Sequence, residues 1–376
     1  MSKPLILLAA GGTGGHLFPA EALAHVLRRR GYAVDLVTDS RAARYAGHFP
    51  AGALHVLPAD TVRSRSPLAL ARTAVTLLRG LVRGLALMRR LKPAVVVGFG
   101  GYPTVPPVLS ATFSGVPSLI HEANGVMGRA NRMLAARVSA IATGFPDILA
   151  DEPHLAGKAV FTGNPLRPAV HAAAETRFDA PEVGSPLRLL VFGGSQGARV
   201  MADVVPQAIA RLNGDLRSRL SVVQQAREED LARVRQTYLD LQVDAEVRPF
   251  FDDLPARMGR AHLVIARSGA STVAELAAIG RPAILVPLPN ALDQDQAANA
   301  KSLEIIGAAL VVPQSAFTPE RLAAALSTFG VDPRALTNMA QAARSAGALD
   351  AAEKLADVVA HLAQGAPIAT YRGPSV

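Results

Sequence analysis

The sequence predicts an α/β protein made of two doubly wound domains, and three observations support this prediction. Short apolar runs alternate with glycine-rich turns and amphipathic helical patterns. This alternation starts near residue 5 and starts again near residue 187. The chain has 376 residues, of which 50% are hydrophobic and 18% charged, so it is long enough for two domains with their own cores. Strands that alternate with helices form parallel sheets through crossover connections, and we therefore expect one such sheet in each half.

The first half contains three apolar runs that we interpret as buried strands. Residues 5–10 lead directly into the loop GGTGGH at residues 11–16. A helical pattern is predicted over residues 19–27. The remaining elements of this half are a strand at 33–37, a strand at 94–97 and the loop GFGG at 98–101. The first run is too short for a signal peptide, and the apolar stretch 93–121 is broken by prolines and glycines, so no membrane span is predicted.

The second half repeats this organisation after a segment, residues 169–186, that is poor in large apolar residues and is predicted to be a linker. Its predicted elements are strands at 187–192, 220–223, 263–266 and 283–287, loops GGSQGA at 193–198 and RSGAST at 267–272, and a helix that ends at residue 279. The C-terminal third is alanine-rich and predicted to be helical, with a polar tail at 370–376. We expect an N-terminal domain at 1–164, a C-terminal domain at 165–346, and a helical segment at 347–376 that returns to the N-terminal domain.

Composition limits the classes of partner. The formal charge of +9 favours an anionic partner, which is a nucleic acid, a membrane surface or a phosphorylated substrate. Cysteine is absent, which excludes disulfide bonds, a thiol nucleophile and cysteine-ligated metals. The chain has no Trp, only 5% aromatic residues and no nucleic-acid-binding motif, so we expect no nucleic-acid partner.

The glycine loops predict binding of a phosphorylated ligand. A glycine-rich turn after a strand lets the backbone approach a phosphate, and the helix that follows presents unpaired N–H groups to it. Neither GGTGGH nor GGSQGA matches the dinucleotide fingerprint or the P-loop. The alternative is that the glycines only allow tight turns, but three loops in equivalent positions favour a ligand. Such domains bind ligands beyond the carboxyl ends of their strands, which predicts a site in a cleft between the two domains.

Polar residues beside these loops are candidates for chemistry. His16 stands at a predicted helix start, which disfavours the imidazolium and favours a neutral base, although a capping or packing role is the ordinary alternative. His121, Glu122 and Asn124 form a polar cluster at a strand end that could equally be a hydrogen-bonded turn.

The second half has its own candidates. The small residues 268–272 can donate hydrogen bonds to a diphosphate, and Glu275 can accept from ribose hydroxyls. The amides of Gln296 and Asn299 suit sugar hydroxyls. Asp293 and Asp295 form a D-x-D pair, which in some enzymes holds a metal but is more often a cap or a solvated turn.

These motifs, in order and across nearly the whole chain, resemble those of the MurG family of bacterial glycosyltransferases. The matching segments are GGTGGH (11–16), GFGGYPTVPP (98–107), HEANGVMGRAN (121–131), GNPLR (163–167), GGSQGAR (193–199), RSGASTVAE (267–275) and the Gln296 and Asn299 patch. The resemblance implies two Rossmann-like domains that face each other across a cleft, the GT-B fold. It implies an inverting transfer of N-acetylglucosamine from UDP-GlcNAc to the C4 hydroxyl of the MurNAc in undecaprenyl-diphospho-MurNAc-pentapeptide. No cofactor and no metal are implied.

The resemblance also assigns residues. It implies that His16 is the general base and that Tyr102, His121 and Glu122 bind or support the acceptor. The implied donor-binding residues are Thr13, Gly14, Gly15, Asn124, Arg167, Ser195, Phe251, Ala270, Ser271, Thr272, Val273, Ala274, Glu275 and Gln296. This sequence departs from the family at Asp295, where Gln is usual beside the sugar-binding Gln, and at Phe251, where a smaller aliphatic residue is common.

The segment between Asp60 and Glu122 contains no acidic residue. Its basic residues are Arg63, Arg65, Arg72, Arg79, Arg83, Arg89, Arg90 and Lys92. At about 100° per residue, one helical stripe carries Arg72, Arg79, Arg83 and Arg90, and the opposite stripe carries Leu70, Leu77, Leu81, Leu85 and Met88. The ordinary explanation is a surface helix with its apolar side on the core. Charge of a single sign instead favours anionic lipid head groups and the acceptor diphosphate, with Val62, Leu68 and side chains of residues 77–87 in the interface. We therefore expect a peripheral protein on the cytoplasmic face of the cell membrane.

Three alternatives remain at this point. A related transferase could use another lipid acceptor, such as a diacylglycerol, and the loops at 98–107 and 121–131 would then differ in what they bind. UDP-GlcNAc 2-epimerases also have two Rossmann-like halves, and such an enzyme would convert the donor alone into an epimer. A non-enzymatic binder of nucleotide sugars is the third alternative.

Overall fold

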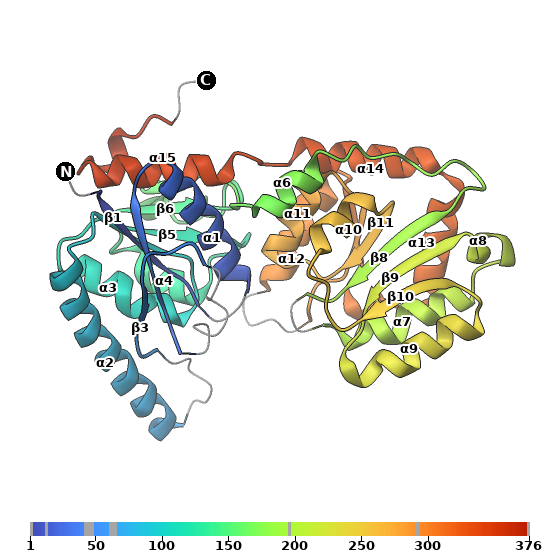
Figure 1. Ribbon diagram of the computed structural model, residues 1–376, viewed down its shortest axis with the longest axis horizontal. Coiled ribbons are helices and arrows are strands. Elements are labelled where there is room, and N and C mark those ends of the chain that lie inside the picture. Colours follow the sequence, from blue (N-terminus) through green and yellow to red (C-terminus); the bar gives the residue numbers. More distant parts are fainter. Residues whose placement is uncertain are drawn as a thin grey trace. The chain divides into compact units, whose positions relative to one another are not determined.

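The computed structural model describes residues 3–11, 14–40, 49–59, 66–194, 197–289 and 294–373, with only the backbone for residues 67–71. The chain divides into two compact units, Met1–Arg167 together with Leu349–Val376, and Pro168–Ala348. Each unit contains its own parallel sheet and its own apolar core (Figure 1). The chain therefore returns to the first unit after it has completed the second.

The first unit is built on a parallel sheet with the order β3-β2-β1-β4-β5-β6-β7 among the described residues. β1 (Leu5–Ala9) lies between β2 (Ala33–Thr38) and β4 (Val95–Gly98), so the strand order reverses at β1. The other strands are β3 (Leu54–Val56), β5 (Ser118–Glu122), β6 (Ala140–Thr143) and β7 (Ala159–Phe161). Ligands of doubly wound sheets bind at such a reversal, and the loops after β1 and β4 flank it.

Helices cover both faces of this sheet. Ile6 and Leu8 of β1 enter a core with α1 (Gly14–Arg29) and α15 (Ala351–Ala363), whereas Leu7 and Ala9 enter a core on the other face. This two-sided burial explains why the strand reads as a continuous apolar run. Arg30, directly after α1, donates to Asp357 of α15 at 2.6 Å. The remaining helices are α2 (Pro67–Leu91), η2 (Tyr102–Thr104), α3 (Val105–Phe113), α4 (Arg129–Ala135), α5 (Pro153–Ala156) and η4 (Ile368–Thr370).

Helix α2 packs closely on α3. A Cβ at Gly84 would lie 2.2 Å from the Ser110 hydroxyl oxygen, so only glycine permits this approach. The same hydroxyl donates to the carbonyl of Leu81 at 3.1 Å. Met88 and Leu87 are buried on this side, as the helical stripes predict for Met88. Among the described side chains of α2, the outer side therefore presents arginines and the large apolar residues Val75, Leu78 and Val82.

The second unit has a parallel sheet with the order β10-β9-β8-β11-β12-β13 among the described residues. The strands are β8 (Leu187–Phe192), β9 (Leu220–Gln225), β10 (Asp244–Arg248), β11 (Leu263–Ala266), β12 (Ala283–Leu285) and β13 (Ala309–Val311). The helices are α6 (Pro168–Ala174), α7 (Arg199–Ala210), α8 (Gly214–Ser218), α9 (Glu228–Asp240), α10 (Leu254–Arg260), α11 (Ala270–Ile279), α12 (Asp295–Ile305), η3 (Gln314–Ala316), α13 (Pro319–Val331) and α14 (Pro333–Ser345). The strand order reverses at β8, so the loops after β8 and β11 flank this reversal.

Two predicted elements differ from the structure. The first helix begins at Gly14 rather than at Pro19, because the end of the glycine loop already forms its first turn. Pro19 lies inside this helix, where its missing N–H removes one backbone hydrogen bond. The predicted linker at 169–186 is wrong in its first part, since α6 occupies residues up to Ala174 and buries Val170 completely.

Candidate active site

His16 lies in the first turn of α1, directly after β1. Its ring packs on the loop after β4. A Cβ built at Gly100 would lie 3.4 Å from the nearest ring atom, and one built at Gly101 would lie 3.3 Å from the ring atom nearest to it. Burial lowers the pKa of His16 below 6.5, and the Glu122 charge and a hydrogen bond to the Phe99 backbone raise it in part. The Nδ1 atom is shielded from solvent and has no hydrogen-bond partner among the described residues. His16 is therefore a neutral imidazole near pH 7, as a general base requires.

Glu122 ends β5 and is only 2% exposed. Its carboxylate accepts from the backbone N–H groups of Asn124, at 3.0 Å, and Gly128, at 2.9 Å. It also accepts from the side-chain amides of Asn124, at 3.2 Å, and Asn131, at 2.8 Å. The polar cluster predicted at this strand end is thus a hydrogen-bonded loop organised by one buried carboxylate.

His121 is completely buried in β5, and its Nε2 donates to the carbonyl of Gly163 at 3.1 Å. Burial lowers the pKa of His121 to about 4, and the hydrogen bond to Gly163 offsets this only partly. Tyr102 begins η2, on the loop that also carries Gly100 and Gly101, and is partly exposed.

The buried His121 predicts a pH dependence of stability. Between pH 6.5 and about 4 the unfolded chain binds a proton that folded His121 does not, so the free energy of unfolding falls as the pH falls through this range. Hydrogen exchange of the β5 amides at about pH 7 and about pH 5 measures this loss. His121→Gln should reduce the difference between the two pH values, and His154→Gln, at an exposed position, should preserve it. Equal pH dependence in wild type and His121→Gln would contradict the assignment.

In the second unit, the glycine loop after β8 folds back on the start of α7. A Cβ at Gly193 would lie 2.2 Å from the backbone nitrogen of Ala198, so the loop requires glycine there. The Gly193 N–H donates to the side chain of Gln225 at 3.0 Å. Arg227 lies along the loop, with its Cγ 3.0 Å from the Cβ position of Gly197, and donates to the Gly197 carbonyl at 3.3 Å. The ends of β8 and β9 and the side chain of Arg227 therefore contact this loop.

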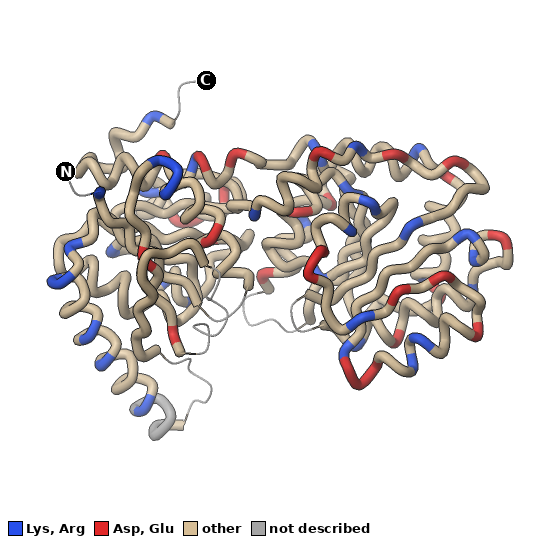
Figure 2. Tube along the Cα trace, viewed as in Figure 1, with Lys and Arg blue, Asp and Glu red and all other residues tan. Residues whose placement is uncertain are grey.

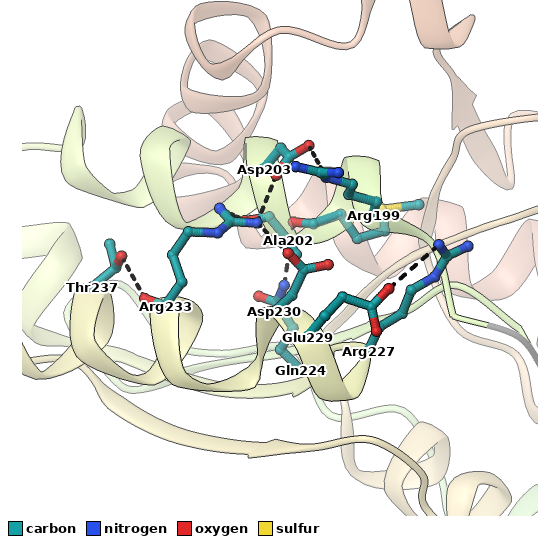
Figure 3. A network of polar contacts seen from close by, with 10 residues as sticks. Arg199, Ala202, Asp203, Gln224, Arg227, Glu229, Asp230, Arg233 and Thr237 are labelled. Atoms are coloured by element: carbon teal, nitrogen blue, oxygen red, sulfur yellow. Dashed lines mark hydrogen bonds and ion pairs between the residues drawn. The ribbon is translucent and has the colours of Figure 1, made fainter.

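A charged network joins α7 and α9 next to this loop (Figure 3). Arg233 donates to Asp203 of α7 and to Asp230 of its own helix, both at 2.7 Å. It also donates to the carbonyl of Ala202 at 3.2 Å. The Asp230 side chain is 5% exposed, so Arg233 compensates a nearly buried charge and ties the two helices together.

The helix after β11 presents the other predicted donor-binding residues. α11 begins at Ala270, and Ser271 and Thr272 in its first turn are partly exposed, whereas Val273 and Glu275 are buried. The Ser268 hydroxyl donates to the carbonyl of Gln296 at 2.8 Å. The Gln296 side chain accepts from the N–H of Leu288 at 3.1 Å. Gln296 is thus held in place beside the start of α11.

The remaining predicted residues fall in several places. Gly14 and Gly15 form the first turn of α1, and Asn124 follows β5. The Arg167 guanidinium stacks on the Phe18 ring at 4.0 Å, and that of Arg257 stacks on the buried Phe251 at 4.4 Å. Thr13, Ser195, Asp293, Val62, Arg63 and Arg65 lie outside the described residues, as do the side chains of Leu68 and Leu70. No group of three or more potential metal ligands occurs in the part of the chain that the structure describes.

Sequence reasoning missed three contributors. The contact between the glycine pair after β4 and the His16 ring joins residues far apart in the sequence. Asn131 belongs to the motif HEANGVMGRAN, but its hydrogen bond to Glu122 becomes visible only when the loop is folded. Arg227 follows β9 and carries no motif of its own.

Two doubly wound domains, each with a glycine loop at its strand-order reversal, form the GT-B fold. Residues 6–143 match the glycosyltransferase family 28 N-terminal domain, and residues 188–355 match its C-terminal domain. A Bradyrhizobium sp. (strain ORS 278) protein is 62% identical over 96% of this chain and 99% of its own length. It is named UDP-N-acetylglucosamine–N-acetylmuramyl-(pentapeptide) pyrophosphoryl-undecaprenol N-acetylglucosamine transferase. A Nitrobacter hamburgensis protein of the same name is 59% identical over 96% of this chain and 98% of its own.

Solved structures agree with this result. The crystal structure of Acinetobacter baumannii MurG is 30% identical, covers 95% of this chain and 99% of its own, and has a TM-score of 0.77. A Neisseria meningitidis UDP-GlcNAc 2-epimerase bound to UDP-GlcNAc has a TM-score of 0.66 over 95% of this chain and 99% of its own. Its identity is only 14%, so that likeness shows the fold alone. The chain belongs to the MurG family of glycosyltransferases.

Proposed function

We propose that this chain transfers N-acetylglucosamine from UDP-GlcNAc to the MurNAc C4 hydroxyl of undecaprenyl-diphospho-MurNAc-pentapeptide, the lipid I to lipid II step of peptidoglycan synthesis. The observation that carries the proposal is the 62% identity, over nearly the full length, to a transferase whose name specifies this donor and this acceptor. The glycine loops at both strand-order reversals support it, because they are suited to phosphorylated ligands.

His16 is the proposed general base. It takes the proton of the C4 hydroxyl while that oxygen attacks C1 of the donor sugar. The bond between C1 and the diphosphate oxygen breaks, and its electron pair leaves with UDP, which gives a β-1,4 linkage with inversion. The neutral state of His16 supports this role, because burial keeps its pKa below 6.5.

The second unit supplies most of the proposed donor contacts. The glycine loop with Ser195 and the start of α11 stabilise the charge on the departing diphosphate, because helix N-terminal N–H groups favour anions. Glu275 binds the ribose and Gln296 the sugar. The proposed contacts are Ala270, Ser271, Thr272, Val273 and Ala274 on the diphosphate and ribose, Arg167 and Phe251 near uracil, and Thr13, Gly14, Gly15 and Asn124 on the donor sugar.

The proposed acceptor residues are Tyr102, His121 and Glu122. Tyr102 is partly exposed and available for contact. His121 and Glu122 are buried, and the Nε2 of His121 and the carboxylate of Glu122 form hydrogen bonds inside the first unit. We therefore assign them a supporting role, in which they shape the loop 123–128 rather than touch the acceptor.

The direct test supplies radiolabelled UDP-GlcNAc and lipid-linked MurNAc-pentapeptide in the presence of a chelator. The expected result is label in the lipid fraction. An epimer formed from the donor alone would overturn the proposal in favour of an epimerase. Label transferred to diacylglycerol but not to the MurNAc lipid would instead identify another acceptor, and loss of transfer only with the chelator would reveal a metal requirement.

The outer side of α2 is the proposed contact with the membrane, at the cytoplasmic face. Figure 2 shows Lys and Arg but no acidic residue along this helix. We define the basic face as the exposed residues Arg72, Val75, Leu78, Arg79, Val82, Arg83, Arg89 and Arg90. Leu78 and Val82 are both 60% exposed. Cationic and apolar side chains on one face suit an anionic lipid interface better than a nucleic acid. None of the helices described here is both long and apolar enough to cross a bilayer.

Charge reversal on the basic face should release the protein from anionic vesicles. In Arg79→Glu/Arg83→Glu, two favourable charges become unfavourable, and at about 1 kcal/mol per basic residue near the surface, binding should fall at least tenfold. Sedimentation with phosphatidylglycerol-containing vesicles at low and high salt measures this binding. Arg321→Glu, at an exposed position of α13, is the matched control and should bind like the wild type. Unchanged binding by the double variant would contradict the assignment, and salt-sensitive binding to RNA alone would favour a nucleic acid instead.

A further inference from the structure

The loop between β4 and η2 passes under the ring of His16. Gly100 and Gly101 have φ values of +87° and +75°, a conformation that side chains other than glycine rarely adopt. The Cβ position of Gly100 lies 3.4 Å from Cε1 and 3.5 Å from Nδ1 of His16. That of Gly101 lies 3.3 Å from both Cδ2 and Nε2. A side chain at either position would therefore meet the imidazole, at its Nδ1 edge for Gly100 and at its Nε2 edge for Gly101.

Asn131 of α4 borders the same place. Its Nδ2 lies 3.5 Å from the Cβ position of Gly100, on the side that the His16 ring occupies. The same Nδ2 donates to the Glu122 carboxylate at 2.8 Å and to the His121 carbonyl at 3.2 Å, so the amide is fixed from β5. Asn131 is 3% exposed. This fixed amide therefore lies beside the same Gly100 position that faces the Nδ1 edge of the ring.

We propose that Gly100, Gly101 and Asn131 are positioning residues that hold the His16 imidazole in the orientation needed to take the acceptor proton. The inference rests on the proposed function, since it assigns how the proposed base is aimed. Gly100 and Gly101, which we call the imidazole seat, have positive φ values that favour glycine, and a Cβ at Gly101 would lie tightly against the ring, at 3.3 Å. Glu122 acts through Asn131 and also faces His16 as a buried negative charge, while the neutral His121 is the other titratable group beside it.

The geometry of proton transfer explains why the orientation of the His16 ring matters. Proton transfer requires the ring nitrogen within hydrogen-bond reach of the acceptor hydroxyl, and a misplacement of about 1 Å can cost about 100-fold in rate. Rotation about the bond between Cβ and the ring is soft for histidine, so the side chain alone does not fix the ring plane. A loop that lies close to both ring edges restricts this rotation.

The test compares Gly101→Ala with Gly115→Ala. Gly115 also has a positive φ, +69°, but nothing lies within 4 Å of its Cβ position, so alanine there adds backbone strain without touching His16. We expect Gly101→Ala to lower kcat about 10- to 100-fold, because the ring is displaced, and Gly115→Ala to keep kcat within about twofold. The KM for UDP-GlcNAc should stay near the wild-type value in both. If Gly101→Ala does not fold, as judged by circular dichroism, Gly100→Ala replaces it.

A double-mutant cycle distinguishes positioning from general damage. In a His16→Ala background, Gly101→Ala should change the residual kcat by less than about twofold, because the group that it displaces is gone. The acid limb of the kcat/KM profile should also move up in Gly101→Ala, since a displaced ring is better hydrated and its pKa rises towards 6.5. An equal loss in both backgrounds, or an equal loss in Gly115→Ala, overturns the inference. Absence of transfer by the wild type overturns the proposed function itself, whereas wild-type transfer with unchanged kcat in Gly101→Ala overturns only this inference.

Discussion

His16→Ala is expected to lower kcat by about 100- to 10,000-fold, the range for loss of a general base. The affinity for UDP-GlcNAc should remain close to that of the wild type, since most proposed donor contacts come from the second unit. Because burial lowers the pKa of His16, the wild-type kcat/KM should reach half of its plateau below pH 6.5 and fall at lower pH as the imidazole takes a proton. Steady-state kinetics with the lipid acceptor and calorimetry with UDP-GlcNAc measure the two effects.

The control for this variant is His25→Ala, which changes an exposed histidine on the same helix. It should keep kcat within about twofold, as expected of a surface substitution. Full activity of His16→Ala, or an acid limb that stays in place without His16, would remove this residue from the base role.

Arg281→Met is expected to lower the free energy of unfolding of the second unit by about 3 kcal/mol, because several buried carbonyls lose their donor at about 1–3 kcal/mol each. Arg281 is 1% exposed and donates to the carbonyls of Ile279, at 2.9 Å, Gly280, at 3.0 Å, and Thr176, at 3.0 Å. It also donates to the carbonyl of Gly259. Burial and two neighbouring arginines lower the pKa of Arg281 to about 10, which shows how poorly this charge is solvated. The substitution removes the charge but leaves these carbonyls without donors.

Urea unfolding followed by circular dichroism measures this loss, since the chain has no Trp to report it. Arg334→Met removes an exposed arginine of α14 and should change the free energy of unfolding by less than about 0.5 kcal/mol. A change below about 1 kcal/mol in Arg281→Met would mean that methionine packs well enough to offset the lost hydrogen bonds.

Much of the fold follows from local sequence signals. The strand at 187–192 and the helix ending at residue 279 were predicted with the bounds that the structure shows, because apolar runs and glycine caps mark them. The sequence does not predict the three-residue strands β3, β7 and β13, whereas β12, which is equally short, lies within the longer apolar run 283–287 that predicts it. The start of α1 was placed too late because glycine and proline both suggest a break, whereas the packing of Leu17 and Ala20 into the core favours helix.

The candidate site was predictable as a set of residues but not as a set of contacts. Parallel strand ends meet at one edge, so the loops after β1, β4 and β5 could be expected to lie together. The sequence does not predict that the Glu122 carboxylate accepts hydrogen bonds from Asn131 and from backbone N–H groups, or that His121 is completely buried. These facts depend on burial and side-chain direction, which result from the packing of the whole unit.

Helix α15 has a consequence for synthesis on the ribosome. Leu355, Val358 and Val359 belong to the same core as the first strand, yet they are translated only after the complete second unit. Until they emerge, the first unit exposes the apolar surface that they later cover, and exposed apolar surface favours aggregation of the unfinished chain. The second lobe, which is continuous in the chain, can finish folding first, so the order of folding is the reverse of the order of synthesis.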